Sequence, residues 1–294
     1  MRAAIFNGPR QIGVGDRPDP TIAAATDAVV RVVLGCVCGS DLWYYRGESP
    51  HDLGPIGHEF IGVVTDIGSD VEVIAEGDFV VSPFTFNDGT CPHCLAGWTS
   101  NCTNGGGFGN HGMDGGQGEG VRVPFADATL VKVPGSGHDD ATMRSLLALS
   151  GVMGTGHHAA ISGDVKRGDA ATEAVLAMTD GVGVDAALEC VGTNQSMATA
   201  FAIARPGSMV GAVGVPHDTE VPINTVIFRN IGLRGGVAPV RRYLPELLHD
   251  VLAGGINPGR VFDFDTDLEG IAEAYAAMDE RRAVKALIRI GSAA

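Results

Sequence analysis

The alternation of apolar and polar positions over residues 1 to about 135 predicts a β domain. Short apolar runs are separated by turn residues, many of them glycine, and they cover residues 28–33, 59–66, 78–82, 120–123 and 129–133. Short strands at this spacing are typical of β-barrels and sandwiches. We therefore expect this part of the chain to form a barrel or sandwich with long loops between its strands.

Beyond residue 165 the pattern changes to alternating helices and strands, which predicts an α/β region. Residues 185–191 read DAALECV, an apolar run typical of a strand buried on both faces of a parallel sheet, with Cys190 as a core thiol. The other expected helices cover residues 141–161 (with a break at Thr155-Gly156), 170–178, 195–204, 242–253 and 268–278, and the other expected strands cover 208–214, 230–233 and 284–290.

The composition limits the classes of partner. The chain of 294 residues has a net charge of −15 and a pI of about 4.8. Nucleic acids and anionic membranes attract basic faces, so we expect neither as a partner. No apolar run has the length of a membrane helix, and the first residues do not resemble a signal peptide. We expect a cytoplasmic protein.

Cys38 and His58 are candidate metal ligands. Cys38 follows an expected strand and His58 precedes another, so both side chains can project into one cleft. A catalytic zinc takes about three protein ligands and keeps one position open for a substrate oxygen. Ser40 could carry a proton from a bound alcohol, and Asp41 and Glu59 are acidic neighbours able to orient the ligands. Taken singly, a buried thiol and a core histidine would also explain the first two residues.

A second cluster has the spacing of a structural zinc site. Cys91, Cys94 and Cys102 follow Asp88 at intervals typical of a compact metal-binding loop. Zinc accepts carboxylate as well as thiolate, so Asp88 can complete a set of four ligands. His93 is a rival fourth ligand, although its closeness to two cysteines hinders it. A lobe held by packing without metal is the alternative.

The motifs CGSD at residues 38–41 and GHExxGxxxxxGxxV from residue 57 resemble the signature of the zinc-dependent medium-chain alcohol dehydrogenases. The resemblance implies an α/β protein with a GroES-like β-barrel catalytic domain at 1–140 and 255–294 and a Rossmann-like domain at 141–254. It implies zinc and NAD(P) as cofactors and an alcohol or aldehyde as substrate, and we expect a homo-oligomer. It makes Cys38 and His58 zinc ligands, Ser40 a proton relay, and Glu59 a neighbour or ligand.

The third zinc ligand departs from this family's pattern. The family has Cys or Asp four residues before the Thr of a Thr-Gly pair, and counting back from Thr155 gives Gly151, which cannot bind metal. Glu59, a water, His157 or His158 would have to complete the set. We expect an Asp introduced at Gly151 to supply the ligand at little cost, because glycine itself weakens a helix by about 0.5–1 kcal/mol relative to alanine.

The nucleotide-binding half is shortened. Only 19 residues separate Val165 from Asp185, fewer than the ~30 of one βαβ unit. By resemblance, roughly 50 residues are absent, including the GxGxxG loop that faces the cofactor pyrophosphate. Gly181-x-Gly183-x-x-Ala186 precedes an expected strand instead of following one, so it is not that loop. We therefore expect dinucleotide binding to be weak.

Some positions still match the family's cofactor contacts. By resemblance, Thr155, Val213 and Val215 lie near the nicotinamide, Val191 and Gly192 near the adenosine, and Lys285 near the pyrophosphate, at an exposed or peripheral position. Three functions remain open. The chain is an alcohol dehydrogenase weakened by these losses, a zinc-binding dehydrogenase-like protein without catalysis, or a zinc-free reductase of the same superfamily. The metal-ligand candidates argue against the third.

Overall fold

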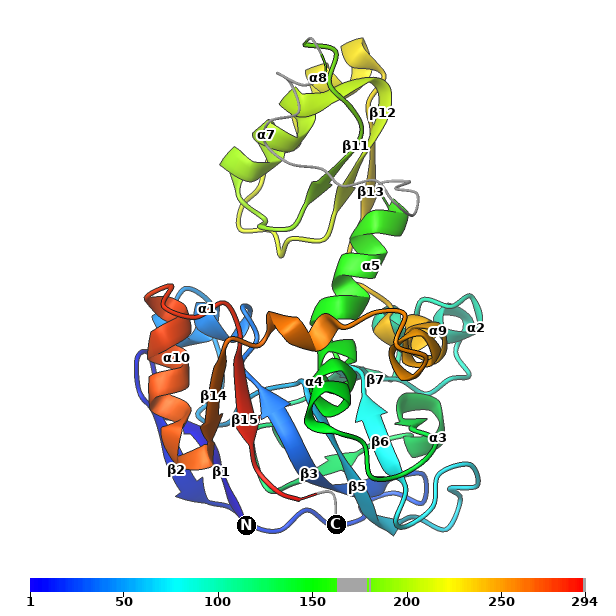
Figure 1. Cartoon of the computed structure of the whole chain (residues 1–294), viewed down its shortest axis with the longest axis vertical. Helices are drawn as coiled ribbons and strands as arrows, with labels where there is room; N and C mark the ends of the chain where they lie inside the picture. The colour runs from blue at the N-terminus through cyan, green and yellow to red at the C-terminus, as the bar shows by residue number, and fades with distance from the viewer. Residues whose placement is uncertain (163–178, 180, 293–294) are drawn as a thin grey trace. The chain divides into compact units, whose positions relative to one another are not determined.

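The computed structural model describes residues 1–162, 179 and 181–292, and it divides the chain into two compact units. Unit 1 comprises Met1–Met153 and Pro239–Ala294, and unit 2 comprises Gly154–Ala238. Unit 2 is thus an insertion in the chain of unit 1, which contains both termini (Figure 1). The sequence predicted these boundaries at 140/141 and 254/255, so residues 141–153 and 239–254 are the ones assigned differently.

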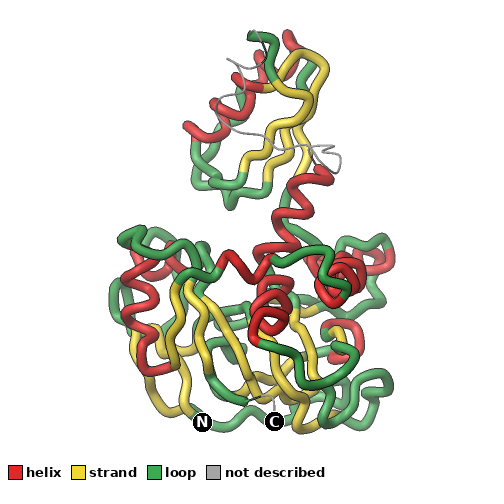
Figure 2. Tube along the Cα trace, viewed as in Figure 1, coloured by secondary structure: helices red, strands yellow, loops and turns green. Residues whose placement is uncertain are grey.

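Unit 1 is built on strands, as its alternating pattern predicts (Figure 2). Its strands are β1 (Arg2–Phe6), β2 (Ile12–Asp16), β3 (Ala28–Cys36), β4 (Gly54–Pro55), β5 (Phe60–Ile67), β6 (Phe79–Ser82), β7 (Thr85–Phe86), β8 (Gly106–Gly107), β9 (Gly120–Val123), β10 (Val131–Lys132), β14 (Phe264–Asp267) and β15 (Ala286–Arg289). The largest sheet has seven strands in the order β10-β6-β5-β3-β15-β14, with β9 also paired to β3. Its path has two ends, so the sheet does not close into the predicted barrel.

The helices of unit 1 are short and cover the sheets. They are α1 (Asp41–Arg46), α2 (Pro92–Leu95), α3 (Ala126–Thr129), α4 (Asp140–Leu149), α9 (Val240–Leu252) and α10 (Ile271–Asp279), with 3₁₀ turns at Thr99–Asn101, Pro258–Val261 and Leu268–Gly270. Every second residue at the start of β3 (Ala28, Val30 and Val32) enters one apolar cluster with Phe60, as the two-residue period of a strand requires. A second cluster surrounds Tyr275 of α10. These two cores hold the loops at the strand ends in place.

The glycines of the GHExxGxxxxxGxxV motif are required by packing. A Cβ atom at Gly62 would lie 2.2 Å from the carbonyl oxygen of Arg31, and one at Gly68 would lie 2.2 Å from that of Ala25. Gly57 has φ +89°, a conformation that favours glycine. The glycine pattern around His58 therefore lets β5 approach β3 closely and fixes the position of His58 just before β5.

Unit 2 contains a parallel sheet of three strands in the order β11-β12-β13. Its elements are α5 (Val152–Ser162, which begins in unit 1), β11 (Val184–Glu189), α7 (Asn194–Ile203), β12 (Ala204–Ala212), α8 (Ile223–Arg229) and β13 (Gly232–Gly235). Ala187 packs with Phe201 of α7 in its core. The α/β class with a truncated parallel sheet is confirmed.

Several expectations for this region need correction. β11 is not buried on both faces, because α7 covers the face of Ala187 while Leu188 on the other face is 39% exposed. Cys190 is exposed and is not a core thiol. The helix over 141–161 breaks at Ser150-Gly151 instead of Thr155-Gly156, because α4 ends at Leu149 and α5 begins at Val152. The helix expected at 170–178 lies outside the described residues.

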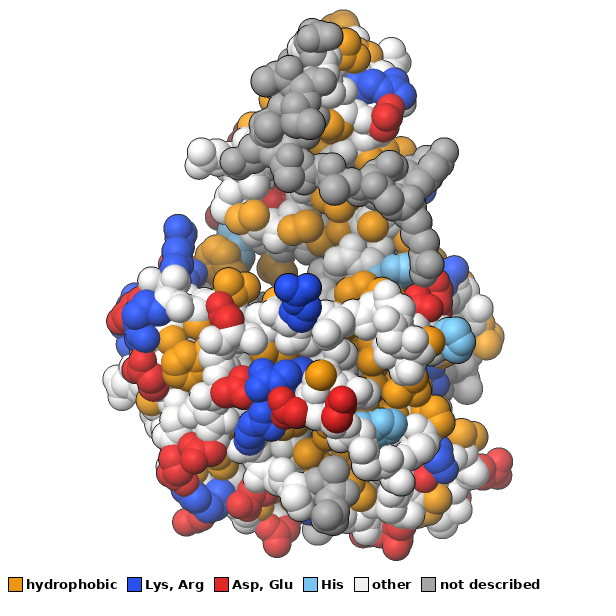
Figure 3. Space-filling model, in the orientation of Figure 1, with side chains coloured by type: hydrophobic (Ala, Val, Ile, Leu, Met, Phe, Trp, Pro, Cys, Tyr) orange, Lys and Arg blue, Asp and Glu red, His pale blue; other side chains and the backbone are white. Residues whose placement is uncertain are grey.

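The surface of unit 1 agrees with an acidic chain that also carries many basic side chains. On the face of this unit drawn in Figure 3, acidic and basic side chains are intermixed. Arg144, for example, is paired with both Asp140 and Asp265. Among the helices that the structure describes, none is long and apolar enough to cross a membrane.

We expect Gly62→Ala to destabilise the chain by about 1–3 kcal/mol, the usual cost of forcing extra atoms into a packed interior. The new methyl would meet the backbone of Arg31, which cannot move without disturbing β3. Gly13→Ala in β2 is the control, because no atom lies within 4 Å of its added Cβ. Denaturant unfolding of the two variants measures the difference, and equal midpoints would contradict the packing explanation.

Candidate functional site

Cys38 and His58 lie at neighbouring strand ends in unit 1. Cys38 follows β3 in the turn that leads into α1, and His58 lies two residues before the start of β5, the antiparallel partner of β3. The turn is fixed by its own hydrogen bonds, since the backbone N–H of Cys38 donates to Oδ2 of Asp41 (3.0 Å) and that of Asp41 donates to the Cys38 carbonyl (3.1 Å). The CGSD motif thus forms a rigid turn beside His58.

The His58 ring is oriented by Asp41. Its Nδ1 lies 3.3 Å from Oδ1 of Asp41, and its Nε2 lies 3.5 Å from the Ser40 hydroxyl. Burial lowers the pKa of His58, but the negative charges of Asp41 and Cys38 outweigh burial and raise it well above its usual range. A metal at this site would bind Nε2 after displacing its proton, while Asp41 keeps hold of Nδ1. The Ser40 hydroxyl lies on the side of Nε2.

Asp41 is itself held by two buried residues that sequence reasoning missed. The side-chain amide of Gln117 donates to Oδ2 of Asp41 (3.2 Å), and the Tyr275 hydroxyl donates to the Gln117 side-chain oxygen (3.0 Å). Hydrogen bonds therefore link Tyr275 through Gln117 to Asp41, whose other carboxylate oxygen faces His58. No local motif could have revealed it, because Gln117 lies in a glycine-rich loop and Tyr275 on α10, far away in sequence.

The surroundings of Cys38 and His58 are called the cleft below, after the expectation from the sequence, and Glu59 points into a buried polar cluster beside them. Its Oε2 accepts hydrogen bonds from Nζ of Lys285 (2.5 Å) and from Sγ of Cys36 (3.0 Å). Burial raises the pKa of Glu59, but the charges of Lys285 and His58 outweigh burial and lower it. Burial raises the pKa of the Cys36 thiol well above its usual range, so Cys36 stays a neutral donor. Glu59 is therefore an ionised carboxylate already occupied by two donors.

Gly151 faces Glu59 directly. A Cβ atom at Gly151 would lie 1.9 Å from Oε1 of Glu59, so any side chain here must displace that carboxylate. An Asp at position 151 would therefore have to push this carboxylate away from Lys285 and Cys36, and the expectation that it costs little stays a prediction. The Ser150 hydroxyl donates to the Phe60 carbonyl (3.0 Å), which holds this stretch against β5. Glu59 occupies the volume of the absent side chain.

The cleft brings two candidate donors together but not a third. Among the described residues, the group of three or more donors within metal-binding reach of one another is Asp88, Cys91, Cys94 and Cys102, and Glu59 does not form such a group with Cys38 and His58. Cys38 and His58 suit a zinc ion as a thiolate and an imidazole. The cleft therefore fits the metal in part, and Glu59 would have to turn to complete it.

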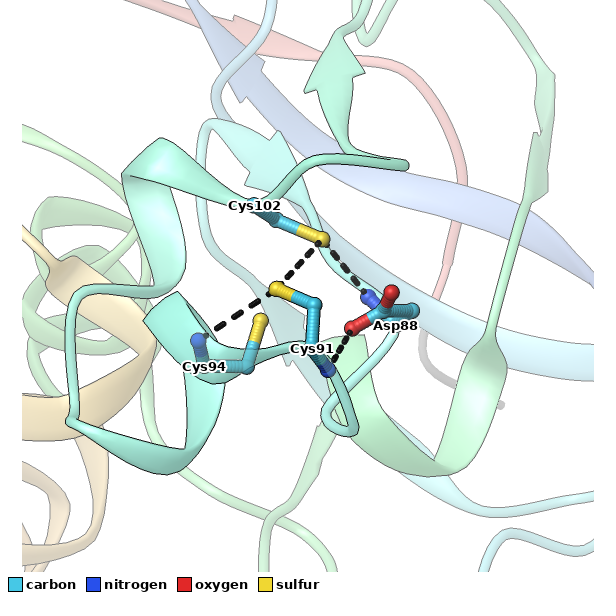
Figure 4. Close-up of side chains that lie close together, drawn as sticks. All are labelled: Asp88, Cys91, Cys94 and Cys102. Carbon is cyan, nitrogen blue, oxygen red and sulfur yellow. Dashed lines mark hydrogen bonds between the residues drawn. The ribbon is translucent and has the colours of Figure 1, made fainter.

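The lobe that contains α2 gathers its four candidate ligands (Figure 4). The ligand atoms of Asp88, Cys91, Cys94 and Cys102 all lie within 4.8 Å of one another. Hydrogen bonds from the backbone N–H groups of Cys94 and Thr103 lower the pKa of Cys91 to about 6, so this thiol ionises readily. Burial raises the pKa of Cys94 to about 12. A bound zinc ion would deprotonate that thiol, since zinc binds thiolates.

Asp88 takes the fourth place in the lobe. Its Oδ1 accepts hydrogen bonds from the backbone N–H groups of Cys91 (3.0 Å) and Thr90 (2.9 Å), which hold its pKa well below the usual range. His93 is exposed and does not belong to the group. Three thiols and one carboxylate close together are a donor set that zinc accepts, so the residues present fit the metal.

The residues matched to cofactor contacts fall in different parts of the chain. Thr155 lies on α5, while Val191 and Gly192 follow β11 and Val213 and Val215 follow β12, all in unit 2. A Cβ atom at Gly192 would lie 1.9 Å from the Val215 carbonyl oxygen, so the last two loops pack closely. Ligands of open α/β sheets bind at such carboxyl ends.

The structure also places three further residues with positions expected from the sequence: Lys285, Gly181 and Gly183. Lys285 belongs to unit 1 and is buried against Glu59, so the expectation of an exposed position is wrong. Its ion pair with a carboxylate explains how a lysine tolerates burial. Gly181 and Gly183 precede β11, as expected, and do not lie between a strand and a helix that follows it.

Comparison with known proteins gives the family. The family model "Alcohol dehydrogenase GroES-like domain" matches residues 24–135, and "Zinc-binding dehydrogenase" matches residues 143–253. A zinc-type alcohol dehydrogenase B of Aspergillus flavus is 28% identical over 99% of this chain and 82% of its own length. A medium chain reductase/dehydrogenase of Acremonium sp. is 31% identical over 74% of this chain and 94% of its own length.

A solved structure, the alcohol dehydrogenase TADH from Thermus sp. ATN1, superposes with a TM-score of 0.89 at 27% identity, covering 99% of this chain and all of the other. The chain belongs to the family of zinc-dependent medium-chain alcohol dehydrogenases. It is thus a member of an oxidoreductase family that includes zinc-binding dehydrogenases. The resemblance drawn from the CGSD and GHE motifs is confirmed.

The alignment with the Aspergillus relative also shows how much shorter this chain is. That alignment spans 354 positions, whereas this chain has 294 residues, so at least 60 aligned positions have no residue here. This agrees with the loss of roughly a strand-helix-strand unit and more, inferred from the spacing between Val165 and Asp185.

We expect Asp88→Ala to weaken zinc binding in the lobe by more than about 100-fold. Loss of a residue that only hydrogen-bonds a metal ligand costs roughly 10–100-fold in metal affinity, and Asp88 would be a ligand itself. His93→Ala is the control, because His93 lies on the same lobe but outside the donor group. Zinc retained during dialysis against a chelator measures the difference. If Asp88→Ala retains zinc as well as His93→Ala does, Asp88 is not a ligand.

Proposed function

We propose that this chain is an oxidoreductase of the alcohol dehydrogenase type, with zinc in the lobe of Asp88, Cys91, Cys94 and Cys102 and a second, weaker zinc in the cleft of Cys38 and His58. The observation that carries the proposal is the orientation of the cleft pair. Asp41 holds one nitrogen of His58, while the other faces Ser40 beside Cys38. The Ser40 hydroxyl is thereby placed where it would accept a proton from an alcohol held beside Cys38 and His58.

Each residue has a defined part in this proposal. Zinc, when bound, supplies a Lewis acid for the oxygen of an alcohol or aldehyde. Cys38 and His58 are ligands, and Glu59 completes the set once it turns away from Lys285. Ser40 accepts the substrate proton through its hydroxyl oxygen. Asp41, fixed by Gln117, keeps His58 in the ring orientation that leaves Nε2 free.

The dinucleotide fits this chain poorly. The glycine loop and helix N-terminus that bind a pyrophosphate in dinucleotide folds have no counterpart in the sequence. Lys285, the residue matched to the pyrophosphate, is buried against Glu59. These observations favour a second candidate function, a zinc-binding protein of dehydrogenase fold that does not transfer hydride.

Alcohol oxidation with NAD or NADP distinguishes the two candidates. The wild-type chain and the Cys38→Ser variant are tested on a panel of small primary and secondary alcohols. Turnover that is lost in Cys38→Ser supports the oxidoreductase. Zinc binding in the cleft without turnover supports the second candidate. The homo-oligomer expected from the sequence stays a prediction, which the mass of the purified protein in solution tests.

We expect NADH and NADPH to bind this chain more weakly than the low micromolar range. The backbone amides that would neutralise the pyrophosphate are missing, and the loops after β11 and β12 provide contacts to other parts of the cofactor only. Quenching of tryptophan fluorescence or calorimetry on the purified chain gives the dissociation constant. A low micromolar or tighter value would reveal another phosphate site and contradict this reasoning.

A further inference from the structure

Lys285 is a buried cation directly behind the cleft. Its side chain is 5% exposed, and its ammonium group donates to Oε2 of Glu59 (2.5 Å) and to the Val37 carbonyl (3.3 Å). Val37 is the residue immediately before Cys38, so the ammonium group also holds the backbone that carries the thiol. No motif of the sequence gives Lys285 a role at the metal, and the resemblance placed it at the pyrophosphate.

The position of Glu59 results from three neighbours. Lys285 and Cys36 hold one carboxylate oxygen, and the other oxygen fills the space over Gly151. In this position the carboxylate lies outside a common metal-binding group with Cys38 and His58. Binding of a metal by Glu59 therefore requires that the ion pair with Lys285 open.

We propose that Lys285 is a positioning residue that competes with the cleft metal for the carboxylate of Glu59. This inference rests on the proposed function, since it assumes a metal at Cys38 and His58. Lys285 thereby keeps the cleft folded without metal, and it sets how tightly the cleft binds metal.

The cost of burying an unpaired charge supports a competition between Lys285 and the metal for the Glu59 carboxylate. A buried charge that loses its partner is strongly destabilising, whereas a buried pair is tolerated. When Glu59 turns to the metal, the ammonium group of Lys285 keeps the Val37 carbonyl but loses its counter-charge. That cost opposes metal binding at the cleft. In the lobe, the hydrogen bonds that the structure describes to the Asp88 carboxylate come from two backbone N–H groups and from the uncharged Asn104 side chain, which accounts for the unequal affinities proposed above.

Cobalt binding tests the competition, because Co²⁺ bound by a thiolate has a visible absorption spectrum. The lobe is first filled with zinc, and Co²⁺ is then titrated into the wild type, Lys285→Met, Lys285→Arg, Glu59→Gln and the double variant Glu59→Gln/Lys285→Met. Cys38→Ser identifies the part of the spectrum that comes from the cleft. Circular dichroism and thermal unfolding of each variant are recorded with and without Co²⁺.

We expect Lys285→Met to bind Co²⁺ in the cleft at least about tenfold more tightly than the wild type, the lower end of the effect of residues that support metal ligands. Lys285→Arg, which keeps the charge and can keep the ion pair, should restore an affinity close to that of the wild type. In the Glu59→Gln background, Lys285→Met should change the affinity little. The cobalt spectrum of Lys285→Met should also differ from that of Glu59→Gln, because the carboxylate joins the metal only in the former.

Three results would overturn the inference. One is unchanged or weaker Co²⁺ binding by folded Lys285→Met. Another is an equal tightening by Lys285→Met in the wild-type and Glu59→Gln backgrounds, which would reflect only the removal of a positive charge near the metal. The third is that no variant binds Co²⁺ in the cleft.

Stability gives a second measurement if Lys285→Met unfolds easily. Folding of that variant on addition of Co²⁺ supports the inference, because the metal then replaces the lost partner of Glu59. If the Lys285→Met variant stays unfolded with Co²⁺, the Lys285→Gln variant is used in its place, since glutamine removes the charge but keeps a hydrogen-bond donor.

The proposed function fails separately, when Cys38→Ser leaves Co²⁺ binding unchanged. Loss of binding in Cys38→Ser without tightening in Lys285→Met refutes the competition alone.

Discussion

The ion pair between Glu59 and Lys285 is the interaction on which the candidate cleft depends. Glu59 immediately precedes β5 and Lys285 immediately precedes β15, and both strands are antiparallel partners of β3. The pair therefore lies where three strands of the sheet meet, directly behind the turn of Cys38. Unit 1 consists of two segments of the chain, one before and one after unit 2. Glu59 belongs to the first segment and Lys285 to the second, so this buried pair joins the two segments. Burying two charges is tolerated only because they are paired and hydrogen bonded.

The cleft and the lobe differ in how the chain positions their donors. In the lobe the four ligands lie within one short segment, and backbone N–H groups already favour the ionised forms of Asp88 and Cys91. Binding of a metal there needs little rearrangement. In the cleft the donors come from separate loops, and the carboxylate of Glu59 is bound to the ammonium group of Lys285. Sequence spacing and local hydrogen bonds thus favour the lobe, whereas tertiary contacts restrain the cleft.

The parts of this structure that sequence alone could predict are the local ones. Strand periodicity located β3, β5, β6 and β9, and the spacing of Cys91, Cys94 and Cys102 located the lobe, because neighbours in sequence determine both. The contacts of Gln117, Tyr275 and Lys285 could not be predicted, since each reaches the cleft from a distant element. The exposed Cys190 and the half-exposed β11 were mispredicted for a related reason. An apolar run indicates burial only where a covering layer exists, and the described part of unit 2 covers one face through α7.

The type of residue at position 151 and the orientation of Glu59 depend on each other. A side chain at position 151 and the present carboxylate position exclude each other, because they claim the same volume. A chain with a ligand at 151 must hold Glu59 elsewhere, and a chain with glycine there can bury Glu59 against Lys285. The missing ligand is therefore not a simple vacancy in an otherwise unchanged site. The carboxylate of Glu59 fills that space, and its ion pair with Lys285 holds it there.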